Sequence, residues 1–161
     1  MNFTKTIVTG LVLASIAGTA AISAGHADKA ALAAVKARQS TMTLYSFNLG
    51  QLGAMAKGDV EYNADAASAA AGNLAKLTSM SQMAAWMPGT DNATLGEDVT
   101  HALPAIWESG SMIGDKGKAL REAVVALEAA AGGGLESLQG AMGPVGKACG
   151  GCHETYRAKM N

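Results

Sequence analysis

Aromatic residues are scarce in this 161-residue chain, at 4% of the total, and proline occurs only three times. Few stretches alternate Val, Ile, Thr or aromatic residues with polar ones, so the usual sign of half-buried strands is missing. This argues against a fold built mainly from β-sheet. Ala, Leu, Lys and Glu, which favour helix, are plentiful instead. We therefore expect an all-α protein.

An excess of charge of one sign is also lacking. Lys and Arg number 12 against 13 Asp and Glu, which gives a formal net charge of −1 at pH 7. No basic stripe of the kind that neutralises phosphates is present, so nucleic acid is not an expected partner. We find no set of residues in the sequence that pairs a nucleophile with a general base, and no set that would activate a metal-bound water. We therefore do not expect an enzyme.

Long apolar runs are absent after residue 27. Before that point, Lys5 precedes an apolar run over residues 7–22, and small residues follow. This order predicts a secretory signal peptide over residues 1–27, cleaved after Ala27 or, alternatively, after Ala24. An uncleaved membrane anchor is the other reading, but the run is short for a span of about 20 apolar residues. We expect a mature domain over 28–161 that is soluble and exported to the periplasm.

Apolar residues recur at helical spacing in four segments: 28–57, 64–83, a third from near Pro104 to the glycines at 132–134, and 135–159. Asn63 is a candidate N-cap for the second segment. Pro144 should kink or divide the fourth. Two short links and an irregular connection over 88–103 predict an antiparallel up-down-up-down four-helix bundle. The expected inner face of the first segment contains Leu32, Val35, Gln39, Met42, Leu49, Leu52 and Ala56.

Cysteine is limited to Cys149 and Cys152, and His153 directly follows the second. A structural zinc ion needs four ligands, and the predicted mature domain has only His101 as a further histidine. A thioredoxin-like dithiol expects a strand–helix setting, of which there is no sign. A disulfide across Gly150 and Gly151 would close a loop too small to stabilise much. These readings fit the sequence less well than the next one.

The spacing C-x-x-C-H indicates covalent haem attachment, in which each thiol adds to one vinyl group. On a helix, Cys149, Cys152 and His153 stand at positions i, i+3 and i+4 and project from one face. The two intervening glycines leave room for the porphyrin edge near the backbone. We expect one haem c per chain, held by both cysteines, with His153 as the proximal iron ligand.

The stretch K-A-C-G-G-C-H-E-T-Y-R at 147–157 resembles the class II c-type cytochromes, the cytochrome c′ family, which carry this motif near the C-terminus. Further stretches agree with the resemblance: A-R-Q-S-T-M at 37–42, M-A-K-G-D-V-E-Y at 55–62 and A-L-P-A-I-W at 102–107. The likeness covers the whole mature domain. It implies the same four-helix architecture, for which this family is a standard example.

The resemblance also implies a set of site residues. Met42 stands four residues after Arg38 in R-Q-S-T-M, the position that carries the distal iron ligand in the low-spin branch of the family. A His/Met haem raises the reduction potential and suits single-electron transfer. The alternative is that Met42 only fills the core and that a five-coordinate, high-spin haem binds nitric oxide or carbon monoxide. A bis-histidine haem using His101 is a further, less favoured alternative.

The remaining expectations come from the same resemblance. Arg38 is expected at a haem propionate, with Gln39 beside it, and Arg157 next to the proximal His153. We interpret Trp86 and Trp107 as packing residues. Partners are expected to be redox proteins, with homodimer formation through the first two helices as a further possibility.

Overall fold

The computed structural model describes residues 19–159, with side chains from Lys29 onward. The predicted signal peptide, at residues 1–27, therefore lies outside the residues whose side chains are described. The first helix, α1, spans Thr19–Lys57. Cleavage after Ala27 would consequently place the mature N-terminus within α1.

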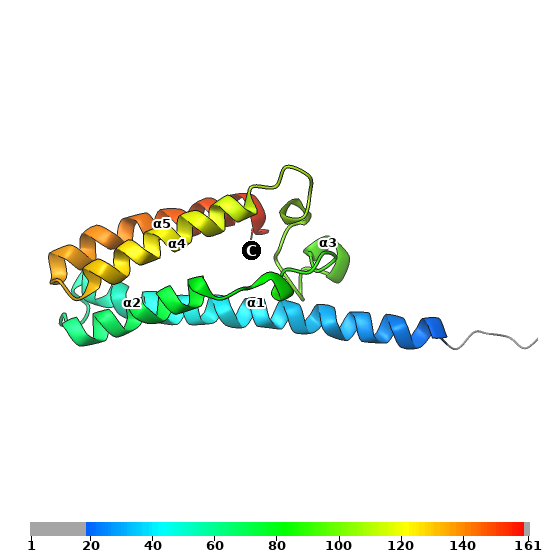
Figure 1. The fold of residues 1–161 in the computed structure, drawn as a ribbon, viewed down its shortest axis with the longest axis horizontal. Helices are drawn as coiled ribbons and strands as arrows, with labels where there is room; N and C mark the ends of the chain where they lie inside the picture. Colours follow the sequence, from blue (N-terminus) through cyan, green and yellow to red (C-terminus); the bar gives the residue numbers. More distant parts are fainter. Residues whose placement is uncertain (1–18, 160–161) are drawn as a thin grey trace, which may run out of the picture.

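Four long helices form the molecule, and over residues 19–159 no β-strand is present. After α1 come α2 (Ala64–Ser79), the short α3 (Asn92–Leu95), α4 (Ile113–Ala131) and α5 (Leu135–Tyr156). The long helices run alternately in opposite directions (Figure 1). The predicted all-α, antiparallel up-down-up-down bundle is confirmed. Within the described residues, no helix combines the length and apolar character needed to cross a bilayer.

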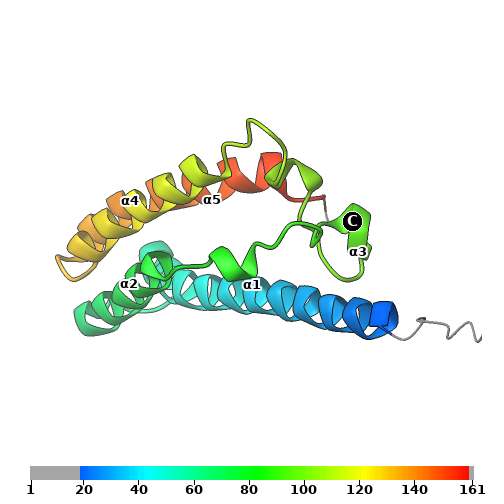
Figure 2. The same ribbon diagram turned by 45° about the vertical axis from the view of Figure 1, so that its right-hand side comes forward.

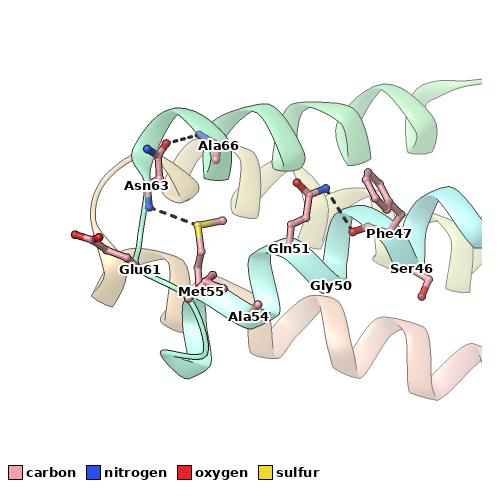
Figure 3. A pocket seen from close by; sticks show the side chains of 10 residues that line it. Ser46, Phe47, Gly50, Gln51, Ala54, Met55, Glu61, Asn63 and Ala66 are labelled. Carbon is pink, nitrogen blue, oxygen red and sulfur yellow. Dashed lines mark hydrogen bonds between the residues drawn. The ribbon is translucent and has the colours of Figure 1, made fainter.

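The first two helices end and begin where the sequence indicates. Gly58, with φ of 80°, follows the last residue of α1. The side chain of Asn63 caps α2 by accepting a hydrogen bond from the backbone N–H of Ala66 at 2.8 Å (Figure 3). This satisfies one of the backbone donors left free at a helix start. The predicted N-cap is therefore confirmed.

The long connection between α2 and α4 differs from the prediction. α2 ends at Ser79 and α4 begins at Ile113, so the connection spans 80–112 and not 88–103. Pro104 opens only a 3₁₀ turn, Pro104–Ile106, which closes when the Trp107 N–H donates to the Pro104 carbonyl at 2.9 Å. Proline suits the first turn of either helix type. Gly110, with φ of 86°, then prevents an α-helix from continuing.

Pro144 does not divide the last helix, because α5 is continuous from Leu135 to Tyr156. The bundle core lies between the four long helices. Its largest fully buried side chains are Leu52, Leu74, Val124, Leu127, Leu138 and Val145. Burying a side chain of this size stabilises a fold by about 1.5–3 kcal/mol.

The N-terminal half of α1 is covered less completely than predicted. The helix pairs α1–α2 and α4–α5 lie close together near their short connections and diverge toward the other end (Figures 1 and 2). There α2 has ended, and the 80–112 connection is the segment beside α1. Val35 is buried, but Leu32, Gln39 and Met42 are exposed, so the prediction that these three lie inside the bundle is wrong.

Candidate functional site

The two cysteines and His153 lie in the last turns of α5, where all three are half-buried. Their spacing places them on one face of the helix. The two thiols are not joined in a disulfide. Between them, Gly151 lies under the Lys116 ammonium, which is 3.6 Å from the point a β-carbon would occupy. A side chain at residue 151 would therefore contact Lys116.

Burial shifts the titration of all three groups. It raises the pKa of the Cys149 and Cys152 thiols, although the nearby Lys116 charge partly offsets this at Cys152. Burial also lowers the pKa of His153, and the positive charge of Arg157 lowers it further. Both effects favour the neutral form of the imidazole. A neutral imidazole is the form that binds a metal ion.

The end of α5 is fixed by the connection that precedes α4. Ala102 pairs with Arg157 in an isolated antiparallel bridge. The Leu103 N–H donates to the Tyr156 carbonyl at 3.0 Å, and the Ala158 N–H donates to the His101 carbonyl at 2.8 Å. The backbone of Arg157, directly after the last helical turn, is therefore anchored within one turn of His153.

His101 accepts the Ala158 hydrogen bond through its backbone carbonyl. The residue as a whole is exposed. Among residues 19–159, no group of three or more His, Cys, Asp or Glu side chains is placed to hold a metal ion.

Met42 lies at about the same level along the bundle as His153, by the register of α1 against α5. The Gln139 side chain donates to the Ala56 carbonyl at 2.7 Å and so joins the two antiparallel helices. About three turns further along each helix are Tyr45 and Cys149, which pack against the same core. Burial is the main cause of the raised pKa of Tyr45, and the negative charge of the Cys149 thiolate also raises it. About one more turn reaches Met42 on α1 and His153 on α5.

Met42 shares a helix face with Tyr45, three residues away. The Met42 residue is 39% exposed.

Arg38 and Gln39 both contact the 80–112 connection. The Arg38 guanidinium donates to the carbonyls of Ala85 and Thr90 and to the hydroxyls of Thr90 and Thr100. Gln39 donates to the Val99 carbonyl at 2.9 Å. The two threonines carried no signal in the sequence, because hydroxyl residues are common in irregular segments.

The residues at the end of α5 fit a covalently attached haem. Two thiols one turn apart, with no disulfide between them, match two points of attachment. The adjacent imidazole belongs to the same helix face, and burial favours its neutral form. The donor set is thus a c-type haem set rather than one for a hard cation such as Ca²⁺.

Comparison with known proteins agrees with this chemistry. The family described as "Cytochrome C'" matches residues 33–157. Cytochrome c-554 from Cereibacter sphaeroides is 44% identical over 126 residues, which are 78% of this chain and 80% of the relative. Cytochrome c′ from the same organism is 42% identical over 127 residues, covering 78% of this chain and 83% of the relative.

Solved structures extend the likeness to the fold. A cytochrome c′ from Rhodobacter spheriodes superposes with a TM-score of 0.77 at 40% identity, over 81% of this chain and 98% of that one. A ferrous variant of cytochrome c prime from Alcaligenes xylosoxidans with bound NO gives 0.68 at 34% identity, over 79% and 94%. A cytochrome c′ described as having ligand-controlled dimer dissociation gives 0.72 at 30% identity, over 80% and 97%.

Proposed function

This chain belongs to the cytochrome c′ family, with one covalently attached haem c as its cofactor, and on that premise we propose the roles of its site residues. Cys149 and Cys152 form the thioether bonds, and His153 binds the iron from the proximal side. The observation that carries the assignment is the shared face of these three residues at the anchored end of α5. When bound, the haem supplies an iron centre that exchanges single electrons and binds small gases.

We propose binding of nitric oxide or carbon monoxide at the distal face as the main function. The structurally similar Alcaligenes xylosoxidans protein has been solved with bound NO, and another form of it with bound carbon monoxide. In this reading Met42 covers the distal face as an apolar side chain. The chain is then a binding protein and not a catalyst.

Electron transfer through a low-spin His/Met haem is the second candidate. One observation supports it: by the register of α1 against α5, residue 42 is at about the same level along the bundle as His153. A thioether is a flexible, polarisable donor that can reach a metal centre on its unbranched stem. In this reading redox proteins of the periplasm are the partners.

The visible spectrum of the haem-loaded protein decides between the two. We expect a broad high-spin spectrum that sharpens on addition of carbon monoxide, because an open distal position accepts the gas. A sharp low-spin spectrum when reduced, with the weak long-wavelength iron–sulfur band when oxidised, would instead support Met42 as a ligand. A protein purified without visible colour would contradict both candidates.

Three further residues complete the proposed haem environment. Arg38 and Gln39 are proposed to contact the propionates, since both contact the 80–112 connection, which also pairs with the end of α5. Arg157 is proposed to cover the proximal side, where its charge already acts on His153. We also propose that residues 1–27 direct export to the periplasm, where c-type haem is attached, and are then removed.

A shallow groove between α1, the link that follows it and the start of α2 is the proposed homodimer surface (Figure 3). Phe47 and Val60, which line it, are 66% and 51% exposed. Exposed apolar side chains gathered in one place mark interaction sites. We propose a second copy as the occupant, because a solved relative is described as a dimer whose dissociation depends on ligand.

Phe47→Glu is expected to shift the protein toward monomer, because a carboxylate buried at an interface loses its hydration without gaining a partner. We expect the dissociation constant of the dimer, measured by sedimentation equilibrium, to rise at least about tenfold. Val125→Glu is the matched control, because Val125 is also exposed but lies on α4. Equal dimer content in Phe47→Glu and wild type would exclude this surface.

A further inference from the structure

Arg38 is a buried charged residue in α1, whose other charged side chains over residues 29–57 are exposed. Only 5% of it is exposed. Its two terminal nitrogens make four hydrogen bonds to the 80–112 connection, at 2.6 to 3.3 Å, to Ala85, Thr90 and Thr100. A buried charge is costly unless it is fully partnered. The connection therefore keeps its place against α1 as long as Arg38 stays inside.

Two indole rings complete the enclosure of the guanidinium. Its central carbon lies 5.0 Å from the ring centroid of Trp86 and 5.8 Å from that of Trp107. Trp107 also donates its ring N–H to the Trp86 carbonyl at 3.0 Å. A planar guanidinium can stack on rings and donate hydrogen bonds at its edge at the same time. A lysine ammonium cannot reproduce both contacts.

Thr100 connects this enclosure with the end of α5. Its hydroxyl oxygen accepts from Arg38 at 3.3 Å and from the Ala102 N–H at 3.2 Å. Ala102 is the residue that pairs with Arg157. The Arg157 N–H in turn donates to the His153 carbonyl at 3.2 Å. An unbroken series of direct contacts thus leads from α1 to the proximal histidine.

We infer that Arg38 is a positioning residue that clamps the 80–112 connection onto α1 and, through Thr100, fixes the backbone around His153. This role is separate from any contact between Arg38 and a haem propionate. The clamp itself follows from the hydrogen bonds. Only its effect on an iron ligand rests on the proposed function.

Amide hydrogen exchange in the haem-loaded protein tests the clamp. In Arg38→Lys and in Thr100→Val, we expect exchange at the Leu103 and Ala158 amides to be about tenfold faster, because both amides donate across the connection–α5 pairing. The amide of Leu127, in the core of α4, should be unaffected. Lys36→Gln is the matched control, since it removes an exposed charge from α1 without touching the connection. Unchanged exchange at Leu103 and Ala158 would overturn the inference.

The iron–histidine stretching band, measured by resonance Raman on the ferrous protein, provides the second readout. A clamp predicts that Arg38→Lys and Thr100→Val shift this band in the same sense, and that the double variant shifts it little further. A shift in Arg38→Lys with none in Thr100→Val would mean that Arg38 acts on the haem directly, and would refute the clamp. Absence of haem from the wild-type protein would contradict the proposed function. The comparison of amide hydrogen exchange between the variants and the wild type would still test the clamp.

Discussion

The double variant Cys149→Ala, Cys152→Ala is expected to release all of its haem into acidified organic solvent, whereas the wild-type chain should retain it. The chain contains no other cysteine, so nothing else can form a thioether bond. Without these bonds, His153 would be the only strong proximal link, and acid protonates a histidine ligand. The expected loss is therefore complete. Extraction followed by mass spectrometry of the protein measures it.

The single variants sharpen this test. Each is expected to keep haem attached through one thioether, and the pyridine haemochrome band should shift in each because one vinyl group stays unsaturated. Glu154→Gln is a suitable control, because Glu154 is exposed on the same turns of α5 but lies away from the cysteine face. Retention of haem by the double variant would show that a different residue makes the bond.

These site residues could be read from the sequence because all three lie on one helix. Only the local geometry of α5 is needed to bring Cys149, Cys152 and His153 to one face, and that geometry depends on residues a few positions apart. The bundle was predictable for a related reason. Apolar spacing marks each long helix, and short links force neighbouring helices to run antiparallel.

The clamp around Arg38 illustrates what periodicity does not show. Its partners Thr90 and Thr100 are 52 and 62 residues away along the chain, in an irregular segment. Hydrogen bonds to such a segment depend on its tertiary path and not on a repeating pattern. Trp86 and Trp107 were predicted to be packing residues, and the structure shows what they pack against: the guanidinium of Arg38.

The start of α4 was misjudged for a local reason. Proline is equally suitable for the first turn of a 3₁₀ and of an α-helix, and the residues after Pro104 are compatible with both. The positive φ of Gly110 separates the turn from α4, and a glycine in sequence does not reveal its φ. The resulting longer connection is the segment that holds the end of α5 in place.

Met42→Ala is expected to raise the affinity of the ferrous protein for carbon monoxide by at least about tenfold, because either proposed function places Met42 at the distal face. If the side chain covers that face, its loss opens the path of the gas. If its sulfur binds the iron, its loss removes a competitor for the same position, and the gain should exceed a hundredfold, or about 2.7 kcal/mol. Carbon monoxide titration followed by visible absorption measures the affinity.

Met42→Leu separates the two explanations, because leucine conserves most of the volume and removes the sulfur. If Met42 only covers the distal face, the leucine variant should bind carbon monoxide about as well as the wild type and have the same spectrum. If Met42 is a ligand, leucine should raise the affinity nearly as much as alanine and convert a low-spin spectrum into a high-spin one. Met83→Ala is the matched control, since Met83 is a solvent-exposed methionine outside α1. Wild-type affinity in Met42→Ala would place Met42 away from the distal face and would contradict the register of α1 against α5 from which its position was inferred.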